Sequence, residues 1–193
     1  MNTVIGDPND PLVDFITIHP RTRKTPSTAP INTEALSLLA SEFGHKVPLL
    51  LSGDVNTLSH LPFSNPNSSP SSASPFDQTN PNPPTPSSTK IAGLMSARAL
   101  LCNPALFAGH QTCPWPAVES FMRHVARAPL PLRLVQHHLG EMCGPGMGPD
   151  KAALLDRKER GVLLGLGSML EVVDFMDEMI ELKTGRVGGV RRV

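Results

Sequence analysis

Three short polar segments follow apolar runs and carry side chains suited to binding an anion. They are residues 19–23 (HPRTR), residues 52–54 (SGD) and residues 96–98 (SAR). A small turn with an arginine at the start of the next helix suits a phosphate, because backbone N–H groups and a guanidinium converge on it. Ordinary solvated loops have a similar composition, so the spacing alone leaves both interpretations open.

Three cysteines could also carry chemistry, but their arrangement does not favour it. Cys102, Cys113 and Cys143 form an odd set without C-x-x-C spacing, which argues against a disulfide framework and against a structural zinc site. We interpret all three as reduced thiols and predict no metal site. Cys102 is predicted to pack in an apolar setting on a helix, as buried free cysteines commonly do.

The polar segments require a sheet that brings them together. Apolar runs of strand length at 12–19, 47–51 and 90–95 predict three β-strands, and residues 33–43 show the apolar spacing of a helix. A strand, a helix and a strand at this spacing form a βαβ unit, which implies parallel strands. In parallel α/β folds ligands bind at the carboxyl ends of the strands, where the three polar segments lie.

The second half of the chain has a helical pattern throughout. The expected helices are 114–128, 131–144, 151–167 and 168–185. Ser168 with Glu171 is predicted to form a capping box for the last helix, and Gly185 is predicted to end it. Asn32 or Thr33 is predicted to cap the helix of the first half.

Composition limits the partners and the location of the chain. Lysine plus arginine and aspartate plus glutamate each number 17 in 193 residues, so any nucleic-acid contact must be local. No stretch has the length of a membrane span and the first residues show no leader pattern, which predicts a cytoplasmic or nuclear location. Residues 62–90 contain 8 Pro and 8 Ser and are predicted to be a disordered insertion.

Several segments resemble the tRNA-dihydrouridine synthases, among them a Glu-Arg stretch and SMLEVVDFMDE (168–178), which are similar to the helical C-terminal domain of these enzymes. VDFITIHPRTR (13–23) resembles the stretch in which a strand of these enzymes ends in His-Gly-Arg-Thr-Arg, and VPLLLSGDV (47–55) resembles their Asn-Gly-Asp strand end. IAGLMSARALLCNPALFAG (91–109) resembles their final barrel strand and following helix, and APLPLRLVQHHLGEMCGPGM (128–147) resembles their helical C-terminal domain. The similarity is to the eukaryotic branch that acts at D-loop positions 20a and 20b.

The resemblance implies an α/β fold: a partial (β/α)8 TIM barrel, of which the last three strands are present, followed by an all-α C-terminal helical domain. Residues 1–113 would be the FMN-binding barrel part, with the insertion at 62–90. Residues 114–183 would bind tRNA, and a basic tail, 184–193, would follow. In this family NADPH reduces the flavin, the flavin hydride reduces a uracil double bond in tRNA, and a cysteine supplies the proton.

The resemblance also implies roles for individual residues. The implied cofactor-binding residues are His19, Ser52, Gly53, Asp54, Ala97 and Arg98. His19 would lie near the flavin, and the other five would line its phosphate side. Arg21 and Arg23 are weaker candidates for contact with tRNA. Pro20 stands where the family has glycine, and Ser52 where it often has asparagine, which changes the backbone freedom and one hydrogen-bonding side chain.

Part of the family pattern has no counterpart in this sequence. An eight-stranded barrel needs on the order of 250 residues, and the first five strands, with the Asn-x-x-Cys loop that carries the catalytic cysteine, are not matched. We therefore expect an incomplete copy that lacks an N-terminal half and whose catalytic residue is unknown. Two alternatives stay open: a non-catalytic fragment that binds tRNA or a partner, and another flavin- or phosphate-binding barrel.

Charged residues on the expected helices leave a tRNA contact open. The basic residues of the first three helices are Arg123, Arg127, Arg133, Arg157, Lys158 and Arg160. They suit phosphate contact, but a solvated charged face explains them equally well, and the last helix is acidic. His137 and His138 point about 100° apart on a helix and cannot share one ion, so they are predicted to form a polar edge or part of the tRNA-facing surface.

Overall fold

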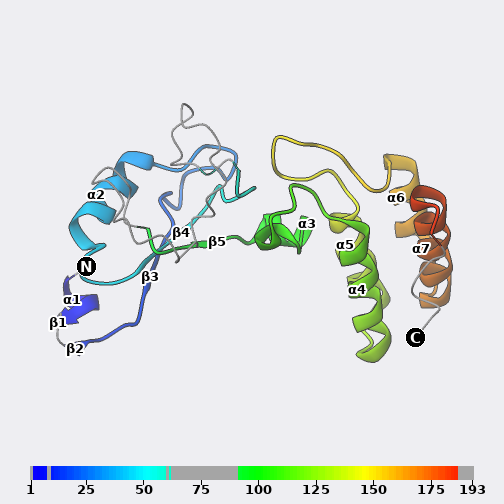
Figure 1. The fold of residues 1–193 in the computed structure, drawn as a ribbon, viewed down its shortest axis with the longest axis horizontal. Helices are drawn as coiled ribbons and strands as arrows, with labels where there is room; N and C mark the ends of the chain where they lie inside the picture. Colours follow the sequence, from blue (N-terminus) through cyan, green and yellow to red (C-terminus); the bar gives the residue numbers. More distant parts are fainter. Residues whose placement is uncertain (1, 8–9, 60, 62–90, 187–193) are drawn as a thin grey trace. The chain divides into compact units, whose positions relative to one another are not determined.

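The computed structural model describes residues 2–7, 10–59, 61 and 91–186. The predicted Pro/Ser insertion and most of the predicted basic tail lie outside these residues. The chain divides into two compact units, Met1–Ser96 and Ala97–Val193, which are described separately. Together the described residues form a mixed α/β protein with a three-stranded parallel sheet in the first unit and helices alone in the second (Figure 1).

The sheet of the first unit has the order predicted for a βαβ unit. Its strands are β3 (Ile16–Ile18), β4 (Leu49–Ser52) and β5 (Gly93–Met95), and β4 pairs in parallel with both neighbours. Helix α2 (Thr33–Phe43) connects β3 to β4, and the side chain of its N-cap Asn32 accepts a hydrogen bond from the Ala35 amide. The predictions of parallel strands and of a cap at this helix are therefore confirmed.

One face of the sheet packs against α2. The strand register places Ile18, Leu51 and Leu94 in one row. Ile18 and Leu51 are buried in a cluster with Leu36 and Phe43 of the helix, and Leu94 packs at its edge. Figure 1 shows α2 running along this side of the sheet. Burial of this apolar row accounts for the strand-length apolar runs seen in the sequence.

The opposite face of the sheet is less covered. Thr17 and Met95 are exposed, and Leu50 is half-buried beside Gly93. A Cβ atom added to Gly93 would lie 2.6 Å from Leu50 Cδ2, so the leucine side chain occupies the space above the glycine. This face therefore presents an incompletely packed surface in the described residues.

The first strand is shorter than predicted. The apolar run at 12–19 forms β3 over Ile16–Ile18 alone, because only these positions pair with β4, and Phe15 is 56% exposed. Before it lie a short helix and a hairpin that the sequence did not predict. They are α1 (Asn2–Ile5), β1 (Gly6–Asp7) and β2 (Asp10–Pro11), with β1 and β2 antiparallel.

The second unit packs helices around one apolar core. Its elements are α3 (Arg98–Cys102), η1 (Leu106–Ala108), α4 (Trp115–Arg127), α5 (Leu132–Met142), α6 (Arg157–Gly165) and α7 (Met169–Thr184). Leu139, Leu163 and Met176 are fully buried in the common core of α5, α6 and α7. This compact unit begins at Ala97 and includes α3, which packs on α5, where Cys102 Sγ donates to Glu141 Oε2 at 3.3 Å. The domain boundary between residues 113 and 114 stays a prediction.

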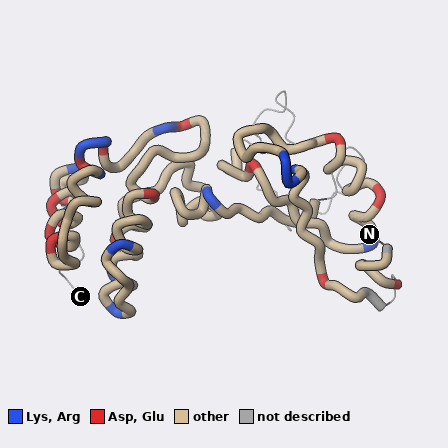
Figure 2. Tube along the Cα trace, turned by 180° about the vertical axis from the view of Figure 1, so that it is seen from behind, with Lys and Arg blue, Asp and Glu red and all other residues tan. Residues whose placement is uncertain are grey.

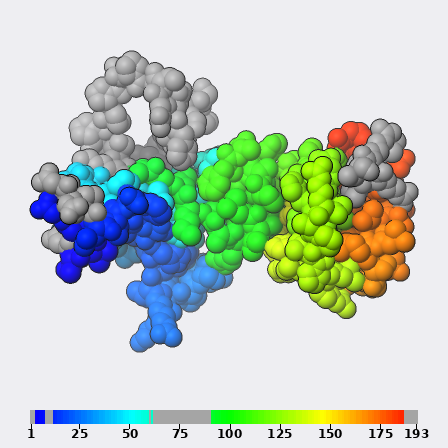
Figure 3. Space-filling model, turned by 90° about the horizontal axis from the view of Figure 1, so that it is seen from below, coloured from blue at the N-terminus to red at the C-terminus, as the bar shows by residue number. Residues whose placement is uncertain are grey.

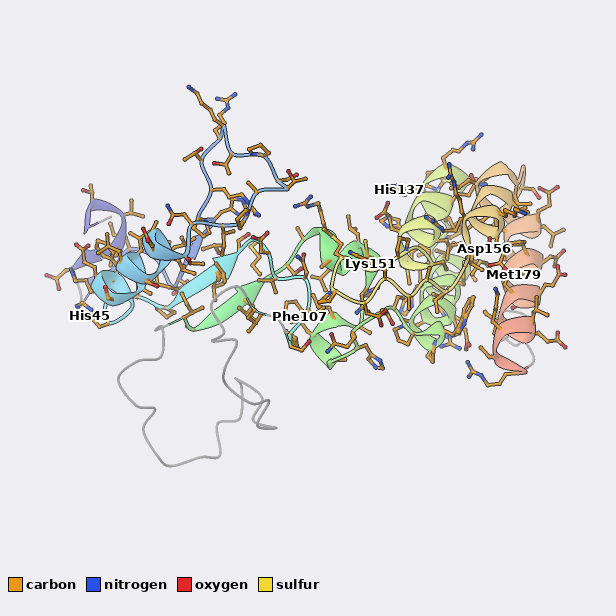
Figure 4. The ribbon with its side chains drawn as sticks, turned by 90° about the horizontal axis from the view of Figure 1, so that it is seen from above. His45, Phe107, His137, Lys151, Asp156 and Met179 are labelled. Carbon is orange, nitrogen blue, oxygen red and sulfur yellow. The ribbon has the colours of Figure 1, made fainter. Side chains whose placement is uncertain are left out.

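Capping boxes define two of these helices. Ser168 and Glu171 form the predicted box at the start of α7, and Gly185 ends that helix in the left-handed conformation with φ 66°. Helix α6 begins at Arg157 and not at residue 151, because Asp156 and Glu159 form a second capping box that the sequence analysis missed. Figure 4 labels Asp156 at this helix start. Across the described part of the chain, no helix has the length and apolar character needed to cross a bilayer.

Candidate functional site

The carboxyl ends of the three parallel strands meet at one edge of the sheet. His19 directly follows β3, Ser52 ends β4, and Ser96 follows β5. His19 Nδ1 lies 3.0 Å from the Ser52 carbonyl oxygen, and Ser96 Oγ donates to the Val55 carbonyl at 2.8 Å. Two of the polar segments predicted from the sequence, 19–23 and 52–54, are thus in direct contact.

The contact with Ser52 determines which nitrogen of His19 carries a proton. A carbonyl oxygen only accepts hydrogen bonds, so Nδ1 must be protonated and must donate to it. Nε2 is then the ring nitrogen left for a ligand, and the His19 side chain is exposed. The neutral imidazole presents an acceptor at this edge, and its protonated form presents a donor.

The turn after β4 requires glycine. Gly53 has φ 111° and is followed by Asp54 with φ 54°, so two successive residues occupy the left-handed region. A Cβ atom at Gly53 would lie 3.0 Å from Ile31 Cγ2 and 3.1 Å from the His19 ring. A side chain at this position would therefore be strained and would also push against the predicted site histidine.

Arg21 and Asp54 form an ion pair beside this turn. The Arg21 side chain is 5% exposed, and its Nε donates to the Ala29 carbonyl at 2.9 Å. The second carboxylate oxygen of Asp54 accepts the Ile31 amide at 2.9 Å. Arg21 is thus occupied within the protein, whereas Arg23, the other arginine predicted to contact tRNA, is exposed. The tip of the loop between β3 and α2 stands out from the first unit in Figure 3.

Ala97 and Arg98 belong to the second compact unit, whereas the other predicted site residues belong to the first. Ala97 is the N-cap of α3, and Arg98 is its exposed first residue. The structure therefore brings together His19, Ser52, Gly53 and Asp54, and it adds Arg21 to them. The roles assigned to all of these residues toward a cofactor stay predictions.

Two curated relatives cover most of this chain. It is 32% identical to the tRNA-dihydrouridine(20a/20b) synthase [NAD(P)+] of Saccharomyces cerevisiae over 173 residues, which is 89% of the chain. It is 30% identical to the protein of the same name from Schizosaccharomyces pombe over 86% of the chain. The chain is a relative of the tRNA-dihydrouridine synthases. The family resemblance predicted from the sequence is confirmed.

The match extends over part of each relative. The chain spans 40% of the length of the Saccharomyces cerevisiae synthase and 41% of the Schizosaccharomyces pombe one, and it matches their C-terminal part. A tRNA-dihydrouridine synthase-like protein of Caenorhabditis elegans is 26% identical over 88% of the chain, which spans 49% of that protein. No family model and no solved structure matches the chain.

The three cysteines of this synthase relative lie in the helical unit, and all are buried. Burial raises the pKa of Cys102 to about 11, with Glu141 as a further cause, and it raises the pKa of Cys113 and of Cys143 to about 12. At neutral pH they are protonated thiols. Cys113 and Cys143 lie in the apolar core of the helical unit, whereas Cys102 is buried beside the Glu141 carboxylate and not in the apolar setting predicted for it. Their surroundings suit packing, because a buried thiol is not accessible to a substrate.

The paired histidines of α5 have different surroundings. His138 packs edge-on against Phe121, with the ring centroids 5.7 Å apart, while His137, labelled in Figure 4, is exposed. Within the described ranges, no group of three or more His, Cys, Asp or Glu residues could hold a metal ion. One of the two rings therefore contributes to the interface between α4 and α5.

Several charges of the helical unit pair within it. Lys183 lies 2.7 Å from Glu159, and Arg133 donates to the Leu164 carbonyl at 3.3 Å. Figure 2 shows acidic residues along α7 and basic residues on α4 and around the start of α6. The basic and acidic residues are thus concentrated on different helices, which leaves α4 and α6 as the candidate surface for an anionic partner.

The sequence analysis missed Ala29 and Ile31, and it named Arg21 as a candidate for tRNA contact without its pairing to Asp54. Ala29 and Ile31 act through backbone groups, which carry no sequence signature. Arg21 lies 33 residues from Asp54 in sequence, so no local spacing pattern could have joined them. The sequence did carry one signal for the turn: the Gly53-Asp54 pair directly after a strand, since glycine and aspartate both tolerate the left-handed conformation that they adopt here.

Proposed function

We propose that this chain forms part of a flavin-dependent tRNA-dihydrouridine synthase and that its strand ends contribute to the FMN site. The observation that carries the proposal is the cluster of His19, Ser52 and Gly53 at the carboxyl edge of a parallel sheet, in a chain similar to synthases of this name. We also propose that the three strands belong to a (β/α)8 barrel, since ligands of such barrels bind at this edge.

The residues present fit an anionic cofactor in most respects. Ser52 offers a half-buried hydroxyl that can donate to a phosphate oxygen, and the turn at Gly53 has no side chain that would block a close approach. His19 Nε2, an acceptor while Nδ1 donates to the Ser52 carbonyl, suits an N–H group of the flavin ring and not its phosphate. The Asp54 carboxylate alone would repel a phosphate, but Arg21 compensates its charge and the protein already engages both of its oxygens. We therefore assign direct contacts to His19, Ser52 and Gly53, with Asp54 held by protein donors. For Ala97 and Arg98 the family resemblance alone supports a role at the phosphate.

The chemistry follows from the proposed family role. When bound, the flavin supplies the hydride that reduces a D-loop uridine of tRNA to dihydrouridine, with NADPH as the reductant. The residues of this chain bind and orient the cofactor, and the helical unit contacts tRNA. We assign the proton transfer to none of Cys102, Cys113 and Cys143, because all three are buried thiols of the helical unit.

A chimera tests the cofactor site. The matching segment of the Saccharomyces cerevisiae synthase is replaced by this chain, and flavin absorbance and tRNA dihydrouridine are measured on the purified protein. Arg98→Ala should weaken FMN binding about tenfold to a hundredfold, since loss of a charge-assisted hydrogen bond to phosphate costs about 1.5 to 3 kcal/mol. Arg23→Ala, which alters another exposed arginine, is the matched control and should retain wild-type flavin content.

The outcomes separate the two functional classes. A chimera that binds flavin and forms dihydrouridine, with the loss confined to Arg98→Ala, supports the synthase proposal. A folded chimera that binds tRNA but contains no flavin would contradict it and would favour a non-catalytic tRNA-binding role. The buried cysteines are the observation that keeps this second role in view.

A further inference from the structure

We propose that Arg21 and Asp54 are positioning residues that hold the His19 imidazole in one tautomer and one orientation at the strand-end site. The inference deepens the proposed function, because it assumes that the strand ends bind a ligand through His19. It assigns Arg21 a role other than tRNA contact and Asp54 a role other than phosphate contact.

Arg21 connects the two ends of the loop between β3 and α2. Its guanidinium reaches the Ala29 carbonyl through Nε and pairs with Asp54 through a terminal nitrogen. Its backbone amide donates to the His19 carbonyl at 2.8 Å, two residues back. With its side chain 5% exposed, Arg21 presents almost no surface to a partner molecule. It ties the loop to the neighbouring strand end.

Asp54 completes the connection from the other strand. One of its carboxylate oxygens pairs with Arg21, and the other accepts the Ile31 amide at 2.9 Å. A ligand would have to displace one of these protein donors to reach the carboxylate. Asp54 also adopts φ 54°, a conformation that aspartate and asparagine tolerate better than most residues. Its position therefore requires both its short side chain and its acceptors.

The connection reaches His19 through Gly53. The Gly53 backbone lies between Ile31, whose amide Asp54 holds, and the His19 ring, because an added Cβ would approach both within 3.1 Å. On the same strand end, the Ser52 carbonyl accepts from His19 Nδ1 at 3.0 Å. Loss of the Arg21–Asp54 ion pair would detach the loop after β3, which begins with His19, from the turn at Gly53. The His19 ring would then lose its fixed position against that turn.

The consequence concerns the protonation geometry of the ring. While Ser52 accepts from Nδ1, the neutral ring must place its lone pair on Nε2, which is the nitrogen available to a ligand. Without that hydrogen bond the proton can occupy either nitrogen, and the ring can rotate. A precisely placed acceptor at the site thus depends on two residues that do not contact the ligand themselves.

The test is NMR spectroscopy of the 193-residue chain labelled with 15N-histidine, at alkaline pH where the imidazole is neutral and without added flavin. In the wild type, His19 should show the Nδ1–H tautomer as its dominant form. Arg21→Gln and Asp54→Asn should each reduce that tautomer to a minority and restore rapid exchange of the ring proton. Asparagine tolerates the φ of Asp54, so Asp54→Asn removes the charge and one acceptor without adding backbone strain.

Two further variants control the test. Arg23→Gln makes the same substitution two residues away on the exposed part of the loop and should leave the tautomer unchanged. Arg21→Lys retains the charge but not the forked donor geometry, and it should keep more of the Nδ1–H tautomer than Arg21→Gln does. A population of the Nδ1–H tautomer that falls from Arg23→Gln through Arg21→Lys to Arg21→Gln supports positioning by the ion pair.

Specific results would overturn the inference. A wild-type His19 in the Nε2–H form contradicts it directly, even if every variant unfolds. Persistence of the Nδ1–H form in folded Arg21→Gln or Asp54→Asn also contradicts it. Because no flavin is present, such a failure leaves the proposed cofactor site untouched, and a chimera without flavin leaves the tautomer result untouched.

Discussion

The two compact units differ in how fully they bury their apolar surfaces. In the helical unit, α4, α5, α6 and α7 enclose a common apolar core, and capping boxes begin α6 and α7. In the first unit, one sheet face packs on α2 while Met95 on the other is 49% exposed. The helical unit is stabilised mainly by burial, whereas the strand-end site also depends on specific polar contacts.

The largest expected effect breaks the helical core. Leu139→Ala removes a fully buried side chain and should lower the free energy of unfolding of the helical unit by about 2 to 5 kcal/mol. Trp115 is the one tryptophan of the chain and packs against this core, so its fluorescence during urea unfolding reports on this unit. Leu182→Ala, at a site 70% exposed, should change the free energy by no more than about 0.5 kcal/mol.

A second change tests the strand-end turn. Gly53→Ala should cost about 1 to 3 kcal/mol locally, because the residue has φ 111° and the new Cβ meets Ile31 and His19. Hydrogen exchange of the loop between β3 and α2 should accelerate while the Trp115 transition stays unchanged. Gly109→Ala is the matched control, since Gly109 has φ 90° but nothing lies within 4 Å of its added Cβ. If each substitution lowers the stability of its own unit by the same free energy, backbone strain alone, and not contact with Ile31 and His19, explains the cost at Gly53.

A third change tests the caps that complete the helical unit. Ser168→Ala removes the side chain that accepts the Glu171 amide and should destabilise this unit by about 1 kcal/mol. Urea unfolding followed by Trp115 fluorescence measures it. Ser37→Ala, on the exposed face of α2 in the other unit, should leave that transition in place. An unchanged midpoint for Ser168→Ala would mean that tertiary packing alone holds the start of α7.

The smallest expected effect is a pH dependence at the start of α6. The backbone hydrogen bond from Glu159 lowers the pKa of the Asp156 carboxyl, so the ionised form is favoured in the folded state. The stabilisation of the folded state by ionised Asp156 is complete above the pKa that this carboxyl has in the unfolded chain. It is lost as pH falls through the lowered pKa of the folded state. The amide chemical shift of Glu159 should follow this titration, and Asp156→Asn should remove the titration while keeping a cap. A shift that persists in Asp156→Asn would assign the titration to another carboxyl.

Much of the fold follows from local sequence patterns. The apolar runs and the helix at 33–43 predicted the parallel sheet, and Ser168 with Glu171 predicted the start of α7. These features depend on neighbours within a few residues, so periodicity and capping signals reveal them. The strand bounds were less accurate, because pairing with β4, and not hydrophobicity, ends β3.

In the candidate site, too, the placement of residues could be predicted from local sequence patterns but their long-range contacts could not. The sequence alone determined that His19, Ser52, Gly53 and Asp54 would lie at strand ends, because chain direction in a parallel sheet places them there. It could not determine that Arg21 pairs with Asp54, or that Ser52 selects the protonated nitrogen of His19. Those contacts join residues 33 positions apart in the chain. Only the tertiary structure brings such groups within hydrogen-bonding distance, since the register of the sheet and the path of the loop set their separation.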